Sequence, residues 1–283
     1  MMALSNGAKA VVDKILYVSD LDGTLLRNDK TISEFTSKAL EKMINDGVLF
    51  TYATARSYVS ASEVIGDLSP RIPSIIYNGT FFRNNDTGEQ ILLSKFENGD
   101  AQKILSTLIE SGVYPLVYAY IDGKECYSYV REKLSCGTAE FVLEHSKNDP
   151  RDNPVCENDL GRGEIFHFTC IEELEKLKPL YEKLKDTHQC VLYKEQYSGK
   201  WWLEIHPYGA TKANAIRELA KMLGASRIIC FGDGVNDISM LEVAHEVYAV
   251  ENADPELKKI ATGVIESNEN DGVVRWLINH LKY

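Results

Sequence analysis

The stretch KILYVS-DLDGT, from Lys14 to Thr24, decides the fold of this chain. Its first six residues form a short, mostly apolar run, which is typical of a strand buried in a parallel sheet. The run ends in an acidic turn that contains Gly23. We therefore expect a buried parallel strand that carries Asp20 and Asp22 just beyond its carboxyl end.

Strand and helix patterns alternate after this turn. Apolar residues at near-helical spacing predict a helix over Ser33–Asp46, closed by Gly47. An apolar strand follows at Val48–Ala53 and, after a further helical stretch, another at Ser74–Tyr77. Short alternating units of this kind predict a parallel sheet with helices on both faces. In such sheets ligands bind beyond the carboxyl ends of the strands.

A different pattern begins after Asn78-Gly79 and indicates an α+β module. Asp122-Gly123 has the composition of a hairpin turn between two strand-like runs. The polar stretch Ser146–Gly163 is expected to be a linker or a loop of this module. The regular elements expected here are strands at Leu116–Ile121, Glu125–Val130 and Glu164–Cys170, and a helix at Glu172–Lys185.

The first pattern resumes at Ala210, so one domain is inserted into another. The expected elements are a helix to Leu223 stopped by Gly224, a strand Arg227–Phe231, a helix through Leu241, a strand Glu246–Val250 and a helix Val273–Leu281. We predict a doubly wound, Rossmann-like α/β core with a parallel sheet from residues 1–83 and 198–283. An inserted α+β cap is predicted from residues 84–197, with function at the interface of the two.

The paired carboxylates Asp20 and Asp22 are the first candidate for chemistry. Two residues apart on an extended segment they would point in opposite directions, but a turn at Gly23 can bring both to the edge of the sheet. One can then attack phosphorus as a free carboxylate while the other transfers protons, and the covalent step splits hydrolysis in two. The motif alone is equally compatible with a solvated acidic turn.

A second acidic cluster, Gly232–Asp237 (GDGVND), also follows an apolar strand. In a parallel sheet Asp233 and Asp237 therefore reach the same edge as Asp20. Like charges packed this closely are costly unless a cation neutralises them, and Mg²⁺ suits a site of carboxylates, water and substrate phosphate. The alternative is a pair of unrelated Asp-Gly turns.

Two further residues supply what phosphoryl transfer needs. Thr54 follows the strand Val48–Ala53, so that its hydroxyl and the next backbone N–H can reach phosphate oxygens. Lys212 lies in the first turn of the helix that follows Ala210, where its ammonium can pair with phosphoryl oxygens and with a carboxylate. Taken singly, a threonine here is compatible with a helix cap and a lysine with a solvated side chain.

Together these residues resemble the haloacid dehalogenase superfamily of phosphohydrolases over the whole chain. The DxDGT motif of that family matches Asp20–Thr24, its threonine and lysine match Thr54 and Lys212, and its GDGxND signature is present at Gly232–Asp237. The long insert between Thr54 and Lys212 looks like the α/β cap of the Cof-type branch, in which Asn78-Gly79 is also usual.

The resemblance implies a role for each matching residue. Asp20 would be the nucleophile and Asp22 the general acid and then the general base. Mg²⁺ would be bound by the side chains of Asp20 and Asp233 and by the backbone carbonyl of Asp22, while Asp237 would hold metal-bound water. Phosphate would contact the Leu21 N–H, Thr54, Lys212 and Asn236. No site for an organic cofactor is implied.

Two positions depart from the commoner pattern, because Ala55 and Ala213 stand where the branch often has glycine. We expect altered packing or amide geometry there, and not lost catalysis. Specificity is expected to reside in the insert. The candidate recognition residues at the interface of core and insert are Arg83, Tyr118, Tyr120, Tyr127, Lys194 and Trp202.

Composition limits the partners and the location. A formal net charge of −11 argues against a nucleic-acid partner, and no apolar stretch approaches the length of about 20 residues that spans a membrane. The six cysteines are scattered singly without zinc-type spacing, so we expect reduced thiols. The first residues lack the basic start of a secretory signal, and we expect a cytoplasmic protein.

The sequence therefore predicts a Mg²⁺-dependent phosphatase that hydrolyses small organic phosphate monoesters through an aspartyl-phosphate. Sugar phosphates and phosphorylated cofactors are both compatible substrates, and the oligomeric state is open. A hexose phosphomutase of the same fold is an alternative, to be distinguished by stimulation with a hexose bisphosphate. A non-catalytic regulator that binds sugar phosphates is the second alternative, and the complete set of motif residues argues against it.

Overall fold

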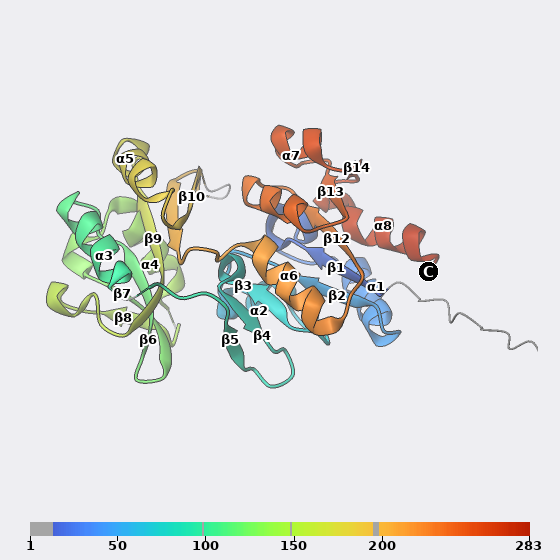
Figure 1. The fold of residues 1–283 in the computed structure, drawn as a ribbon, viewed down its shortest axis with the longest axis horizontal. Coiled ribbons are helices and arrows are strands. Elements are labelled where there is room, and N and C mark those ends of the chain that lie inside the picture. The colour runs from blue at the N-terminus through green and yellow to red at the C-terminus, as the bar shows by residue number, and fades with distance from the viewer. Residues whose placement is uncertain (1–13, 98, 148, 195–197) are drawn as a thin grey trace, which may run out of the picture.

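The computed structural model describes residues 14–97, 99–147, 149–194 and 198–283 and divides them into two parts, each with its own sheet (Figure 1). The first part contains five parallel strands in the order β14-β13-β12-β1-β2. Their bounds are β1 (Ile15–Ser19), β2 (Leu49–Tyr52), β12 (Arg227–Gly232), β13 (Glu246–Val250) and β14 (Gly263–Ile265). The predicted parallel sheet is confirmed, and β1 lies between β2 and β12 at its centre.

Three shorter strands continue this sheet beyond β2. A parallel bridge joins Ala53 to Ile75, which lies in the third strand predicted from the sequence. That strand, β3 (Ser74–Ile76), pairs antiparallel with β4 (Phe81–Arg83), and β4 pairs with β5 (Gln90–Leu92). The chain between β3 and β4 passes through Tyr77, Asn78 and Gly79, all with positive φ.

The helices of this part begin and end where the sequence signals them. Ser33 caps α1 (Glu34–Asn45) by accepting a hydrogen bond from the Thr36 N–H, and Thr211 caps α6 (Lys212–Leu223) in the same way through Asn214. The remaining helices are α2 (Tyr58–Ile65), α7 (Pro255–Ile260) and α8 (Gly272–Leu281). The segment expected as a helix through Leu241 is a 3-10 helix, Val235–Glu242.

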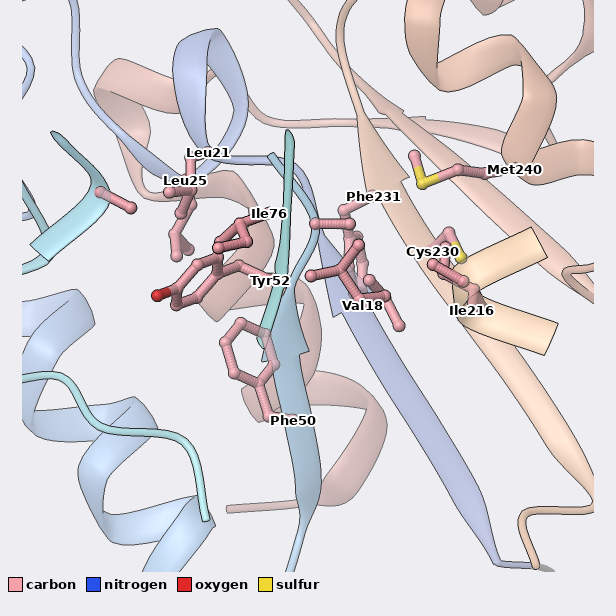
Figure 2. Close-up of a cluster of buried hydrophobic side chains, with 14 of the residues drawn as sticks. Val18, Leu21, Leu25, Phe50, Tyr52, Ile76, Ile216, Cys230, Phe231 and Met240 are labelled. Carbon is pink, nitrogen blue, oxygen red and sulfur yellow. The ribbon is translucent and has the colours of Figure 1, made fainter. Parts of the chain in front are cut away.

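Helices cover both faces of the parallel sheet. Figure 2 shows Val18 of β1 and Cys230 of β12 beside Ile216 of α6. Phe231, the next residue of β12, packs against the ring of Trp276 on α8 with ring centroids 5.2 Å apart. Because successive strand residues point to opposite faces, α6 and α8 lie on opposite sides of the sheet.

The second part is a six-stranded sheet with the order β10-β11-β9-β6-β7-β8. The strands are β6 (Leu116–Ile121), β7 (Lys124–Tyr129), β8 (Asp152–Pro154), β9 (Glu164–Glu172), β10 (Gln189–Lys194) and β11 (Trp201–His206), and the helices are α3 (Asp100–Glu110), α4 (Cys136–His145) and α5 (Leu174–Leu184). The predicted hairpin at Asp122-Gly123 is present as β6 and β7. Leu108 of α3 and Leu180 of α5 share a buried cluster with Phe168 of β9 on one face.

The opposite face of this sheet meets the core. Tyr77, from the core segment after β3, packs its ring against Tyr118 of β6 and Phe166 of β9. The sheets also place β5 beside the core strand β4 and β11 beside the insert strands β9 and β10. We therefore propose that the chain crosses from core to cap within residues 93–99 and returns within residues 207–210.

A substitution at Gly79 tests the close approach of the β3–β4 turn to α6. Gly79 has a φ of +97°, and a Cβ there would lie 2.2 Å from the backbone oxygen of Thr211. We expect Gly79→Ala to lower the free energy of unfolding by about 3 kcal/mol, measured as a shift of the urea midpoint. Gly224→Ala is the matched control, since Gly224 also has a positive φ, but a Cβ there would meet no atom of the described residues within 4 Å. It should cost only about 1 kcal/mol, and equal losses would contradict the proposed contact.

Candidate active site

The ammonium of Lys212 joins two of the predicted carboxylates beyond the carboxyl ends of the central strands. Its Nζ lies 2.5 Å from Oδ1 of Asp20 and 2.7 Å from Oδ1 of Asp237. All three side chains are buried. Asp20 follows β1 directly, and its N–H donates to the Phe231 carbonyl at the end of β12, which fixes the nucleophile candidate to the neighbouring strand.

Burial and charge act in opposite directions in this group. Burial raises the pKa of Asp20 well above its usual range, Lys212 counteracts that rise, and the neighbouring carboxylates add to it. Burial alone would lower the pKa of Lys212, but Asp20 and Asp237 outweigh that effect and the pKa of the ammonium is raised. Lys212 is therefore a permanent cation at neutral pH, placed against the oxygen of Asp20.

Asp233 lies in the turn after β12, and Asp237 lies in the 3-10 helix that follows it. Oδ2 of Asp237 accepts hydrogen bonds from the N–H groups of Asp233 and Gly234, at 2.9 and 3.0 Å. The hydroxyl of Thr24 donates to Oδ1 of Asp233 at 3.0 Å, which ties this turn to the DLDGT segment. Burial, followed by the charge of Asp237, raises the pKa of Asp233 to about 7.

The three carboxylates fit a divalent cation. Asp20, Asp233 and Asp237 each present an oxygen within 4.8 Å of the other two. The donors are all oxygens, which hard cations such as Mg²⁺ prefer. Gly23 leaves space beside them, because a Cβ at that residue would lie 2.3 Å from Oδ2 of Asp233. Burial and the neighbouring carboxylates raise the pKa of Asp20 and of Asp233, and a bound cation would offset both effects.

The remaining predicted residues lie on segments that neighbour this group in the chain or in the cavity. Thr54, buried after β2, accepts the Arg56 N–H on its hydroxyl oxygen at 3.1 Å. Asn236 lies on the same cavity wall as Lys212. Leu21 and Asp22 follow Asp20 in the irregular turn Leu21–Leu25. Neither Ala55 nor Ala213 has a positive φ, so the backbone at these positions does not require glycine.

Arg56 is a site residue that motif reasoning did not identify. Its Nε and Nη2 donate to Oδ2 and Oδ1 of Asp22 at 2.7 and 2.6 Å, and its Nη1 donates to the Ser60 hydroxyl at 2.8 Å. A bidentate guanidinium of this kind fixes both the position and the plane of a carboxyl group. The signal in the sequence was the TyrAlaThrAlaArg stretch, in which Arg56 stands two residues after Thr54.

A cavity of about 210 Å³ lies between core and insert, beside Lys212. The core contributes Asn78, Thr211, Asn236 and Ser239, and the insert contributes Tyr181 of α5 and Gln189–Leu192 of β10. Function at the interface of the two parts was the expectation from the sequence. The cavity wall from the insert is formed mainly by β10, an edge strand of its sheet and an element that the sequence did not indicate.

The six candidate recognition residues lie in different places. Tyr118 and Tyr127 are buried in the interface with the core, and Trp202 packs on Phe141 of α4. Arg83 lies over the ring of Tyr58 and Tyr120 donates its hydroxyl to Gln90, whereas Lys194 is exposed. None of the six is among the residues that line the cavity within the described part of the chain.

A parallel α/β core with a buried lysine between aspartates at the strand ends, closed by an inserted cap, defines a hydrolase that transfers phosphoryl groups. The sequence profile of haloacid dehalogenase-like hydrolases matches residues 17–277. The chain belongs to this family and is a phosphatase.

Relatives and solved structures agree over nearly the full length. The chain is 29% identical over 280 residues to 5-amino-6-(5-phospho-D-ribitylamino)uracil phosphatase YwtE of Bacillus subtilis, covering 91% of this chain and 95% of the relative. The phosphatase YitU of the same organism, named for the same substrate, is 30% identical over 265 residues, with coverages of 93% and 96%. The crystal structure of TM0651 from Thermotoga maritima superposes with a TM-score of 0.74 and 27% identity, covering 94% of this chain and 97% of that one.

The helices of the described residues offer no candidate membrane span, because none combines sufficient length with sufficient apolar character.

A substitution of Arg56 tests its contact with Asp22. We expect Arg56→Ala to lower kcat for an alkyl phosphate by about 10- to 100-fold, because Asp22, the acid predicted from the sequence, would no longer be positioned to protonate the leaving alkoxide. The loss on p-nitrophenyl phosphate should be smaller, since p-nitrophenolate leaves without a proton. Arg71→Ala, which removes an exposed arginine bonded to Asn45, serves as the control. Equal losses on both esters would assign Arg56 to phosphate binding instead.

Proposed function

We propose that this protein is a Mg²⁺-dependent phosphatase that hydrolyses small hydroxyl-bearing phosphate monoesters through a phosphorylated Asp20. The observation that carries the proposal is the buried contact between Lys212 and Asp20 beside Asp233 and Asp237. A carboxylate held by one cation, within reach of a second cation site, has the charge environment that a phosphate dianion needs in order to approach it.

The residues divide the work of two displacements. In the first, an oxygen of Asp20 bonds to phosphorus and the ester oxygen departs, protonated by Asp22. In the second, Asp22 takes a proton from water, the water oxygen bonds to phosphorus, and the Asp20 carboxylate is released with inorganic phosphate. Arg56 holds Asp22 through both steps, and Lys212 stays beside the oxygen of Asp20.

The phosphate itself has a defined set of neighbours. We assign Thr54, Lys212, Asn236 and the Leu21 N–H to its oxygens. Asp20, Asp233 and the carbonyl of Asp22 would hold Mg²⁺, with Asp237 ordering metal-bound water. When bound, the ion neutralises phosphate charge and orients the phosphoryl group toward Asp20. The insert covers this group and limits the access of bulk water.

The cavity wall supports a leaving group that carries hydrogen-bond donors. Asn78 is buried, and its Nδ2 donates to Oε2 of Glu204 at 2.8 Å, while Glu204 also accepts the Tyr193 hydroxyl at 3.1 Å. Oδ1 of Asn78 is buried without a hydrogen-bond partner among the described residues. An unsatisfied buried carbonyl costs about 1–3 kcal/mol, which a ligand hydroxyl or N–H would recover.

These features favour polyol or sugar phosphates and phosphorylated cofactors that carry such chains. The two Bacillus subtilis relatives are named for a phosphorylated ribitylamino compound, whose chain has both hydroxyl and N–H donors. We propose this compound and simpler polyol phosphates as the first substrates to assay. All six cysteines are unpaired, which supports the cytoplasm as the compartment.

Replacement of the nucleophile is the direct test of the mechanism. We expect Asp20→Asn to lower phosphate release by about 10⁴-fold or more, because an amide lacks the charge to attack phosphorus. The change is nearly isosteric, so the circular dichroism spectrum should be retained. Asp86→Asn, at an exposed turn, is the matched control. Substantial Mg²⁺-dependent turnover by Asp20→Asn would rule out the covalent route.

Metal binding should depend on pH through Asp233. An acid whose pKa is raised to about 7 in the folded protein binds a proton below that pH, so Mg²⁺ must displace it. Because the pKa of Asp233 in the folded protein lies above its usual value, the metal-free folded protein loses stability as pH rises toward 7. We expect Mg²⁺ to raise the unfolding temperature more at pH 8 than at pH 6.

The shift in unfolding temperature should vanish in Asp233→Asn and persist in Asp86→Asn. Chelator should abolish turnover of the wild type, and Mg²⁺ should restore it. Full activity in chelator would contradict the metal site. A Mg²⁺-induced rise in unfolding temperature that is the same at pH 6 and pH 8 would contradict the role of Asp233.

A further inference from the structure

We propose that Tyr77 is a positioning residue that couples engagement of the cap to the Arg56–Asp22 pair. The cap holds its side chain, and its backbone holds the segment that carries Arg56. The inference rests on the proposed function in one respect, the role of Asp22 as the proton donor. It assigns a catalytic consequence to a residue that touches neither substrate nor metal.

The ring of Tyr77 packs against three aromatic rings of the cap and also against Phe81 of the core strand β4, with centroids 6.1 Å apart. Its centroid lies 5.8 Å from that of Tyr118, 5.2 Å from that of Phe166 and 5.7 Å from that of His167. The hydroxyl donates to Oε1 of Glu125 at 2.6 Å and accepts from Nη1 of Arg151 at 3.1 Å. The ring and the hydroxyl of this core residue are therefore both in contact with the insert.

The polar groups that contact the Tyr77 hydroxyl are themselves held in place by ion pairs. Arg151 donates to Oε1 of Glu125 at 3.1 Å and, through Nε and Nη2, to both oxygens of Asp149 at 3.0 and 2.7 Å. The side chains of all three are largely buried. Removing one partner from a buried ion pair is strongly destabilising, so these groups keep their arrangement while the cap is folded.

The backbone of Tyr77 is strained and hydrogen-bonded to the catalytic segment. Tyr77 and Asn78 have φ values of +49° and +52°, a region that a bulky L-residue enters only when its surroundings enforce it. The Tyr77 N–H donates to the Arg56 carbonyl at 3.0 Å, and the Asn78 N–H donates to the Thr54 carbonyl at 2.9 Å. Packing of the cap against the ring therefore helps to maintain the hydrogen bonds that these two N–H groups donate to the Arg56 and Thr54 carbonyls.

The last contact in this series is made by the guanidinium of Arg56, which donates to both oxygens of Asp22. When the cap releases Tyr77, the left-handed backbone loses the contacts that enforce it, and the Arg56 carbonyl loses its donor. Asp22 then loses the alignment needed to protonate a leaving group. The proton donor is correctly placed only while the cap is engaged, which limits transfer of the phosphoryl group in the open state.

The experiment compares two esters of similar shape, phenyl phosphate and p-nitrophenyl phosphate. Phenolate is the poorer leaving group and depends more on the proton from Asp22. We expect Tyr77→Phe, which keeps the ring and removes its hydroxyl, to lower kcat for phenyl phosphate by about tenfold and for p-nitrophenyl phosphate by less than about threefold. KM for each ester should change less than kcat.

A second variant approaches the same contact from the cap. Glu125→Gln leaves the core sequence intact and weakens the acceptor for the Tyr77 hydroxyl, so it should change the ratio of the two kcat values in the same direction. The matched control is Tyr248→Phe, which removes a different tyrosine hydroxyl bond, 2.5 Å to Oε2 of Glu246 on β13 of the core. Its ratio should stay within about twofold of wild type.

The outcomes separate this inference from the proposed function. Equal losses on both esters in Tyr77→Phe and Glu125→Gln, or no loss, would overturn the coupling. Asp22→Asn in the same assay tests the proposed function, since it should lose far more on phenyl phosphate. If Asp22→Asn shows no such preference, Asp22 is not the proton donor and the proposed function fails, whatever the Tyr77 variants do. Circular dichroism confirms that each variant is folded.

Discussion

The pairing of one buried ammonium with two buried carboxylates is the interaction on which the rest of this structure depends. Lys212, Asp20 and Asp237 are brought together from α6, from the end of β1 and from the 3-10 helix that follows β12. A buried charge without its partner costs several kcal/mol, so the folded core is stable only when all three groups are in contact. The parallel pairing of β1 with β12 and the start of α6 at Lys212 place these three side chains next to one another.

The same constraint explains the position of the insert. Thr54 and Lys212 belong to the two halves of the core sequence, and the proposed return of the chain to the core, within residues 207–210, directly precedes Lys212. The cap can therefore contact the catalytic segment directly, through Tyr77, as well as form a wall of the cavity through β10. In the proposed function, recognition of the leaving group and alignment of Asp22 therefore share one interface.

Much of the core was predictable because each motif follows an apolar strand. The strands that end at Ser19 and Gly232 place Asp20 and Asp233 at one edge by topology alone, and the caps of α1 and α6 are local signals in the sequence. The partners of the cap were not predictable in this way. Alternation along β11 identifies a strand but not the sheet that it joins, and Arg151 lies within a polar stretch that resembles a loop.

Arg56 and Tyr77 illustrate the same limit, because their contacts join segments that only the tertiary structure brings together. A guanidinium opposite Asp22 and a tyrosine hydroxyl opposite Glu125 leave no periodic pattern. The positive φ of Tyr77 is also contrary to local preference, so tertiary contacts hold it and the neighbouring residues alone do not predict it.

An inserted domain has a further consequence, for the order in which the chain folds. Ile15 of β1 pairs with Arg227 of β12, so the centre of the core sheet closes only after the whole insert has been synthesised. Contacts of such long sequence separation are reached slowly from a flexible chain, and an insert that is already folded holds its two ends near each other and shortens the search.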